Sequence, residues 1–307
     1  MLWIPGGSFP MGSDHHYPEE APAHSVSVES FWMDRTPVTN GQFQKFVKAT
    51  GHVTLAEQPA DRALYPDALP ERLVPSSIVF VPPPGPIGLG DPYQWWQYIP
   101  GANWRHPEGP GSSIKGRDNH PVVHVAHGDA QAYATWVGKE LPSEAEWERA
   151  AWGGKEGAEY AWGDVLHPGG RPMANTWQGT FPHHNTKRDG WERTSPVGRF
   201  PPNGYGLLDM IGNVWEWTDD WYLEHRERFA PDGHGMDPDG GGCCERQRSV
   251  DPNSQHGAIP RKVVKGGSFL CAPNYCQRYR PAARLAQGID TSTCHMGFRC
   301  IVRAPTG

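Results

Sequence analysis

Glycine and proline constrain the fold of this chain more than any other feature of its sequence. The 307 residues include 37 Gly and 32 Pro, which interrupt the chain too often for long helices or strands. Such a content is also compatible with disorder. However, 14 Trp are spread along the sequence, and disordered chains are poor in aromatic residues. We therefore predict an ordered, loop-rich globule in which aromatic side chains supply much of the burial.

Charge and apolar patterning exclude several classes of protein. The net charge is −6, with acidic and basic residues interspersed and no basic stripe, so nucleic acid is not expected as a partner. No apolar run approaches the roughly 20 residues of a membrane span, and the first residues lack the features of a signal peptide. Six Cys are too few for a disulfide scaffold. We expect a cytoplasmic monomer with mostly reduced cysteines.

Short strands are predicted near the start of the chain and around residue 120, and short strands with loops are predicted from Gly153-Gly154 onward. Residues 3–13 indicate a short strand and a glycine turn, whereas residues 24–33 alternate in the manner of one strand. Residues 120–125 predict another strand, and residues 52–120 carry little regular pattern. Because the sequence has no repeat and no break in composition, we predict a single domain over residues 1–307.

Three helices are indicated by caps and apolar spacing. Thr39 is expected to cap a helix that Gly51 ends. A second helix is expected from about Asp129. A third follows the capping box formed by Ser143 and Glu146.

Two cysteines five positions apart are the strongest chemical feature of the sequence. Cys271 and Cys276 flank Pro273-Asn274, a pair of residues typical of tight turns. If the chain folds back there, the two cysteines form a facing pair with Cβ atoms roughly 4.5–5.5 Å apart, although a turn with Pro leaves the register open. That separation permits a reversible disulfide. It also permits two thiolates to hold one soft metal ion, and the residues alone leave both possibilities open.

Side-chain oxygens are interleaved with glycine in two further stretches. Residues 175–179 and 189–191 form one such set, and residues 209–216 form the other. Calcium prefers 6–8 oxygen ligands of this mixed kind. Neither stretch matches an EF-hand loop, and Asn and Asp residues that simply form turns are the alternative. The histidines show no spacing typical of zinc sites.

A series of motifs resembles the formylglycine-generating enzyme (sulfatase-modifying factor) family. The motifs stand in the order known for that family and cover nearly the whole chain: residues 3–12, 36–40, 141–148, 202–207, 212–217, 265–268 and 297–300. Most of them belong to a wider superfamily with several activities. The discriminating motif is Gly-Gly-Ser-x-x-Cys-x-x-x-Tyr-Cys-x-Arg-Tyr-Arg, which contains Cys271 and Cys276.

The resemblance implies both a fold and a reaction. The fold is an α+β, irregular, loop-rich single domain with little regular secondary structure, related to C-type lectin-like folds. The reaction is an oxidation by O2, in which the cysteine of a Cys-x-Pro-x-Arg motif in an unfolded sulfatase polypeptide becomes Cα-formylglycine. The implied cofactors are Cu(I), held by two thiolates, and structural Ca²⁺. Thiolates do select soft Cu(I), and this ion gives O2 a one-electron partner.

The resemblance also implies roles for individual residues. Cys271 and Cys276 are the implied copper ligands and catalytic residues. Ser268 and Tyr275 are implied to line the oxygen-reacting pocket, with Trp215 packed beside it. The implied calcium ligands are Asn175, the Thr176 carbonyl, Asp189 and the Trp191 carbonyl at one site, and Asp209, the Gly212 and Val214 carbonyls and Glu216 at the other.

Other residues have alternative explanations. The different class of function is a non-catalytic lectin-like binding module, with a Cys271–Cys276 disulfide and a Trp-rich groove for a carbohydrate or peptide. In the enzyme, the groove is expected to take an extended peptide. The candidate groove aromatics are Trp95, Trp96 and Trp104, and Arg278 and Arg280 are expected to be ion-pair partners. Cys243 and Cys244 are expected to be free thiols, and Cys294 and Cys300 packed thiols.

Overall fold

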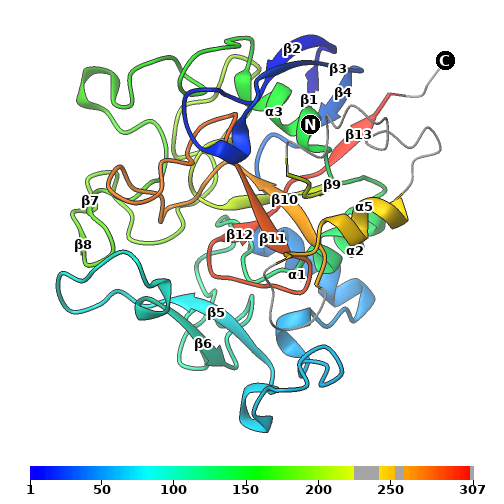
Figure 1. The fold of residues 1–307 in the computed structure, drawn as a ribbon, viewed down its shortest axis with the longest axis vertical. Helices are drawn as coiled ribbons and strands as arrows, with labels where there is room; N and C mark the ends of the chain where they lie inside the picture. Colours follow the sequence, from blue (N-terminus) through cyan, green and yellow to red (C-terminus); the bar gives the residue numbers. More distant parts are fainter. Residues whose placement is uncertain (225–241, 253–258, 305–307) are drawn as a thin grey trace.

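Short helices and strands joined by long loops make up the structure (Figure 1). It is a computed structural model that describes residues 1–224, 242–252 and 259–304. The helices are α1 (Asn40–Thr50), α2 (His127–Trp136), α3 (Glu144–Trp152) and α5 (Gly242–Arg248). The strands are β1 (Leu2–Ile4), β2 (Gly7–Met11), β3 (His24–Val28), β4 (Phe31–Met33), β5 (Ser76–Phe80), β6 (Trp96–Pro100), β7 (Gly179–Thr180), β8 (His184–Asn185), β9 (Trp215–Trp221), β10 (Arg261–Lys265), β11 (Arg284–Gly288), β12 (Met296–Gly297) and β13 (Ile301–Arg303). The predicted α+β, loop-rich fold is confirmed.

A four-stranded sheet of order β11-β10-β9-β12 lies at the centre. Strands β9, β10 and β11 are antiparallel neighbours, and β12 joins β9 in parallel. Residues 266–280 follow β10 and lead into β11, so the sheet holds both ends of the segment that contains the two cysteines.

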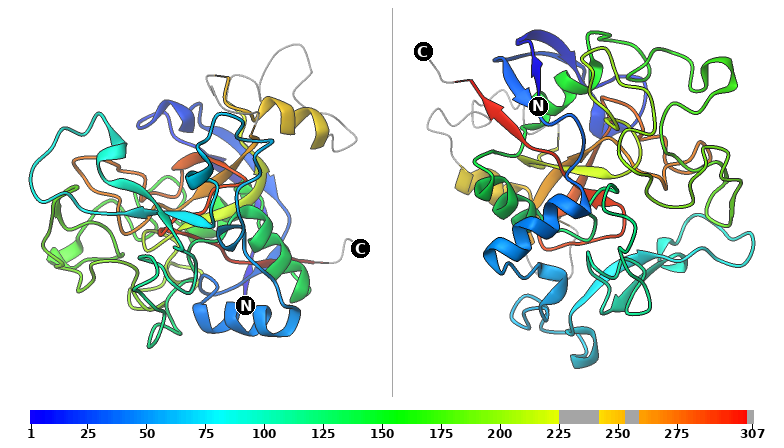
Figure 2. Two further views of the ribbon diagram at one scale, coloured as in Figure 1. Left: turned by 90° about the horizontal axis from the view of Figure 1, so that it is seen from below. Right: turned by 180° about the vertical axis from the view of Figure 1, so that it is seen from behind.

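A second sheet joins the two ends of the described chain. Its order is β1-β4-β13, and Trp32 in β4 is opposite Trp3 on one side and Val302 on the other. The β2–β3 and β5–β6 hairpins lie at opposite ends of the molecule in Figure 1 and in the view from behind in Figure 2.

Helix α3 connects the central sheet to the β2–β3 hairpin, because it contacts β2, β3, β9 and β10. Its Trp147 is fully buried, and the indole N–H donates to Glu216 at 2.8 Å. Arg299 reaches the same carboxylate with two hydrogen bonds of 2.7 and 2.8 Å. In this buried ion pair each charge is compensated by its partner, whereas loss of either partner would leave an uncompensated buried charge.

The predicted helix signals are confirmed. Thr39 forms a capping box with Gln42, and Gly51 ends α1 in the left-handed conformation at φ 72°. Ser143 and Glu146 form the predicted box at the start of α3. Helix α2 begins two residues before the predicted Asp129. Helix α5 was not predicted.

Two strand predictions are wrong in detail. Residues 24–33 form two strands in different sheets, because the chain leaves β3 after Val28 and enters β4 at Phe31. Residues 120–125 form no strand: His124 has a φ of 59°, and its ring is buried against Ser77 at 2.7 Å. The β5–β6 hairpin lies in the stretch expected to lack regular pattern. Within the residues that the structure describes, no helix has the length and apolar character needed to cross a membrane.

Candidate functional site: a thiol pair on a tight turn

The two cysteines meet across a tight turn, as the sequence predicts. The Cys276 and Tyr275 N–H groups both donate to the Ala272 carbonyl, at 3.0 and 3.1 Å. The Cys271 and Cys276 sulfurs lie 3.2 Å apart, well beyond the roughly 2.05 Å of a disulfide bond, and both are free thiols. No strand flanks the turn, so the facing pair comes from a single helix-like turn and not from a hairpin register.

The Gly-Gly-Ser segment lets the chain pass closely behind this turn. Gly267 has a φ of 72°, and a Cβ there would lie 2.8 Å from the Arg278 carbonyl oxygen. The next residue, Ser268, is fully buried and accepts a hydrogen bond from the Cys271 N–H at 3.0 Å. Its own N–H donates to the Cys271 sulfur at 3.4 Å. Ser268 therefore orients Cys271; the role expected for its hydroxyl stays a prediction.

The two thiols differ in environment. Cys271 is 2% exposed, and Cys276 is partly exposed. The hydrogen bond from Cys271, together with Arg278, lowers the pKa of the Cys276 thiol to about 6. Burial raises the pKa of the Cys271 thiol well above its ordinary value. Cys276 is thus the thiol that ionises first and that faces solvent.

Aromatic rings support the turn on its outer side. Tyr275 is 38% exposed and stacks on Phe181, with ring centroids 4.5 Å apart. Asn274 fixes the same contact, because its side chain donates to the Phe181 carbonyl at 3.1 Å and accepts from the Phe181 N–H at 3.2 Å. Tyr275 therefore presents one ring edge to solvent next to Cys276. Whether it lines an oxygen pocket stays a prediction.

The candidate groove aromatics are mostly part of the core. Trp95 and Trp104 are almost completely buried, so the expectation that they line a peptide groove is wrong. Trp96 is partly exposed and packs on His295 with ring centroids 4.9 Å apart. Trp215 is 2% exposed and belongs to the same core cluster as Cys271. Its packing is established, and its role beside the pocket stays a prediction.

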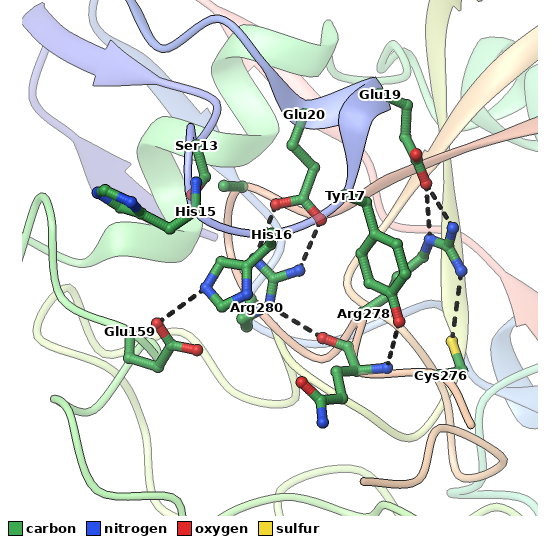
Figure 3. A network of polar contacts seen from close by, with 12 residues as sticks. Ser13, His15, His16, Tyr17, Glu19, Glu20, Glu159, Cys276, Arg278 and Arg280 are labelled. Atoms are coloured by element: carbon green, nitrogen blue, oxygen red, sulfur yellow. Dashed lines mark hydrogen bonds and ion pairs between the residues drawn. The ribbon is translucent and has the colours of Figure 1, made fainter. Parts of the chain in front are cut away.

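A segment near the N-terminus completes the surroundings of Cys276 (Figure 3). Arg278 pairs with Glu19, and its Nη1 lies 4.0 Å from the Cys276 sulfur. Arg280 binds Glu20 through hydrogen bonds of 2.6 and 2.7 Å. The prediction that both arginines are ion-pair partners is confirmed. Sequence reasoning missed the two glutamates, because they stand about 260 residues earlier and match no catalytic motif.

The donor set of the turn fits a soft metal ion. Two thiol sulfurs lie next to each other, and one of them is open to solvent. Thiolate ligands favour Cu(I) over hard cations. Cys271 and Cys276 would hold the ion.

The first set of predicted calcium ligands also fits a cation. Asp189 Oδ2 is buried and has no hydrogen-bond partner among the described residues. Burial raises the pKa of this carboxyl to about 6, and the backbone N–H groups of Trp191 and Thr176 oppose the shift. Asn175 is buried and anchored to the Arg193 carbonyl at 2.9 Å. A buried carboxylate oxygen without a partner is a suitable ligand for a divalent cation.

The second set does not fit calcium, because Glu216 is already committed. Its two oxygens accept hydrogen bonds from Arg299 and Trp147, so we correct the expectation that it is a calcium ligand. Asp209 is buried and accepts from the Gly198 N–H at 2.6 Å, and burial raises the pKa of its carboxyl to about 6. Gly212 lies on the same turn with a φ of 76°, and its N–H donates to the Gly266 carbonyl at 2.9 Å. Val214 is buried just before β9.

The remaining cysteines are separate from the thiol pair. Cys294 is buried and accepts from the Phe80 N–H at 3.3 Å. Cys300 is fully buried just before β13. Both are packed thiols, as predicted. The side chains of Cys243 and Cys244 lie outside the described residues.

The fold agrees with comparisons to known proteins. The chain belongs to the sulfatase-modifying factor family, because the family's sequence model, described as "Sulfatase-modifying factor enzyme 1-like domain", matches residues 1–304. Among curated relatives, the "Formylglycine-generating enzyme" of Mycobacterium tuberculosis is 54% identical, over 100% of this chain and 99% of the relative. The mouse protein of the same name is 43% identical, over 98% of this chain and 74% of the relative.

Other relatives show how far the similarity reaches. The mouse "Inactive C-alpha-formylglycine-generating enzyme 2" is 36% identical over 98% of this chain and 84% of the relative. Among solved structures, PvdO from Pseudomonas aeruginosa has a TM-score of 0.58 at 24% identity, covering 98% of this chain and 93% of PvdO. CarF has a TM-score of 0.51 at 18% identity, covering 99% and 97%. These structures support the fold alone.

Proposed function

We propose that this protein is a formylglycine-generating oxidoreductase. In this proposal it uses O2 and Cu(I) to convert the cysteine of a Cys-x-Pro-x-Arg motif, in an unfolded sulfatase polypeptide, to Cα-formylglycine. The observation that carries the proposal is the pair of free thiols 3.2 Å apart on the surface turn. The 54% identity to a protein named for this activity supports it.

The two thiols have different tasks in the proposed reaction. Metal binding requires both sulfurs to lose their protons, and the depressed pKa of Cys276 makes that loss easier for this thiol. Cys271 is held by Ser268 and stays buried. Bound Cu(I) would supply the one-electron partner that O2 needs and that side chains lack.

The substrate peptide would approach from the exposed side of the turn. Cys276 is partly exposed and Tyr275 presents its ring there, so the peptide cysteine can come near the pair without displacing core residues. Tyr275 offers a hydroxyl and a ring edge, and its ring is stacked on Phe181. Such a rigid ring can contact an extended peptide at low entropic cost.

Calcium belongs to the proposal at the first site. Asp189, Asn175, and the Thr176 and Trp191 carbonyls would hold the ion about a buried carboxylate oxygen that has no partner among the described residues. The ion would neutralise the charge whose burial is unfavourable. Its role would be structural.

The test uses a peptide that contains Cys-x-Pro-x-Arg. Reduced protein is loaded with Cu(I), supplied with O2 and a reductant, and the peptide is followed by mass spectrometry. Loss of sulfur from the peptide cysteine is expected, together with its absence in Cys271→Ser and Cys276→Ser. Cys300→Ala, which removes a buried thiol elsewhere in the core, is the control and should stay active.

The outcome also separates the proposal from the binding-module alternative. No loss of sulfur with fully copper-loaded protein would refute the enzyme. A silent copper titration in protein with an oxidised Cys271–Cys276 pair would favour a non-catalytic module instead.

A further inference from the structure

Residues 17–20 cross over the segment that follows Cys276, and we call them the strap (Figure 3). The strap contains Tyr17 and a single 3-10 turn over Pro18–Glu20. It contacts three polar residues of the facing segment: Tyr17 meets Gln277, Glu19 meets Arg278, and Glu20 meets Arg280. The catalytic motif of the proposed function does not include these strap residues.

The Glu20–Arg280 pair is the structural anchor of the strap. Its side chains are 0% and 3% exposed, and the two hydrogen bonds between them measure 2.6 and 2.7 Å. Arg280 also donates from Nε to the Gln277 carbonyl at 2.9 Å. This buried pair joins the strap to the facing segment.

The Glu19–Arg278 pair lies closer to the thiols and to solvent. Its side chains are 19% and 21% exposed, so its contribution to attachment is smaller than that of the buried pair. Arg278 presents Nε and Nη2 to Glu19 and turns Nη1 toward the Cys276 sulfur at 4.0 Å. The guanidinium is thus held with one edge on the carboxylate and the other beside the sulfur.

The Tyr17 ring packs against one face of the Arg278 guanidinium. Its ring lies 3.8 Å from the Arg278 guanidinium carbon, a cation–π distance. Its hydroxyl accepts from the Gln277 N–H at 3.0 Å, directly after Cys276 in the chain. One side chain therefore restrains both the backbone after Cys276 and the cation beside it.

We propose that Tyr17 and Glu19 are positioning residues: they hold the Arg278 guanidinium beside the Cys276 sulfur and so fix its orientation relative to that thiol. The inference rests on the proposed function for its catalytic meaning. The arrangement itself stands on the contacts. A planar guanidinium suits this task, because its donors are fixed in a fork and its charge is permanent.

The test compares Glu19→Gln and Tyr17→Phe with a control glutamate outside the strap. Glu159→Gln is the control, because Glu159 pairs with His16 at 3.0 Å and does not touch the strap's partners. Two readouts are taken: alkylation of Cys276 by iodoacetamide in copper-free protein, and kcat and KM for the peptide with copper-loaded protein. Melting temperatures are measured for all variants.

Glu19→Gln should slow alkylation and lower kcat by roughly tenfold, the factor that corresponds to one charge-assisted hydrogen bond. KM should stay within about twofold, because the strap touches the thiol segment and not the open side of the turn. Tyr17→Phe keeps the ring beneath Arg278 and should have a smaller effect. Glu19→Asp should restore part of the rate, and Glu159→Gln should behave as the wild type.

Two results would overturn the inference. One is that iodoacetamide alkylates Cys276 in the Glu19→Gln variant at the wild-type rate. The other is a loss that simply follows the fall in melting temperature, which would make the strap structural only. If alkylation responds as expected but the wild type never modifies the peptide, the positioning stands and the proposed enzyme fails.

Discussion

Removing the Cys271 thiol should make Cys276 a weaker acid. The hydrogen bond from Cys271, across 3.2 Å, is the largest contribution that lowers the pKa of Cys276 from 9.0 to about 6. A hydrogen bond to a charged group is worth about 1.5–3 kcal/mol, which equals about one to two pKa units. In Cys271→Ala the pKa of Cys276 should therefore rise to about 7–8, with Arg278 still in place.

Alkylation of copper-free, reduced protein by iodoacetamide measures this shift, because the thiolate is the reactive form. The rate at Cys276 is followed between pH 5 and pH 10 by mass spectrometry of its peptide. At pH 7 the thiolate fraction should fall from about nine-tenths to about one quarter for a pKa near 7.5, so the rate should fall about fourfold. Cys271→Ser keeps a hydroxyl donor and should shift the midpoint less.

The reasoning is refuted if the midpoint in Cys271→Ala stays at about 6 or moves lower. That result would mean that Arg278, and not the neighbouring thiol, determines the acidity of Cys276. Cys300→Ala serves as the control for the loss of a buried thiol, and its midpoint should match the wild type.

Three further predictions address the calcium sites and the backbone. Burial raises the pKa of Asp189 to about 6, so ionisation of its carboxyl destabilises the cation-free fold as pH rises from about 4 through 6. Asp189→Asn should therefore raise the melting temperature at pH 7.5 but not at pH 4, and it should abolish stabilisation by Ca²⁺. An unchanged response to Ca²⁺ would exclude this site. Glu216→Gln should lower the free energy of unfolding by about 3–5 kcal/mol, because Arg299 loses its buried partner. Urea titrations should show the same loss with and without Ca²⁺. A loss seen only with Ca²⁺ would restore Glu216 as a calcium ligand. Gly267→Ala should destabilise the protein more than Gly51→Ala. Both glycines have a φ of 72°, but an added Cβ would lie 2.8 Å from a backbone oxygen at Gly267 and would meet nothing within 4 Å at Gly51. Equal losses in melting temperature would contradict the close approach.

Local chemistry explains what the sequence could predict. The caps of α1 and α3 depend on residues three positions apart, and the thiol pair depends on a turn of five residues. Such features depend on residues close together in the chain, so the sequence alone can predict them. The loop-rich character follows in the same way from the glycines and prolines.

Long-range pairing explains what could not be predicted. The β5–β6 hairpin forms although its strands are separated by the loop over residues 81–95. Glu216 looked like an oxygen ligand in its own stretch, but its partner Arg299 stands 83 residues away. His124 adopts a positive φ because tertiary contacts with Ser77 outweigh local preference. No single-sequence pattern specifies these partners.

The contacts between the strap and the segment after Cys276 have a consequence for synthesis on the ribosome. Glu19 and Glu20 emerge first, and Arg278 and Arg280 follow about 260 residues later. At about 5–20 residues per second, the early carboxylates wait at least ten seconds for their partners. The thiol turn therefore acquires its final surroundings only after the roughly 260 residues between these partners have been made and are available to fold.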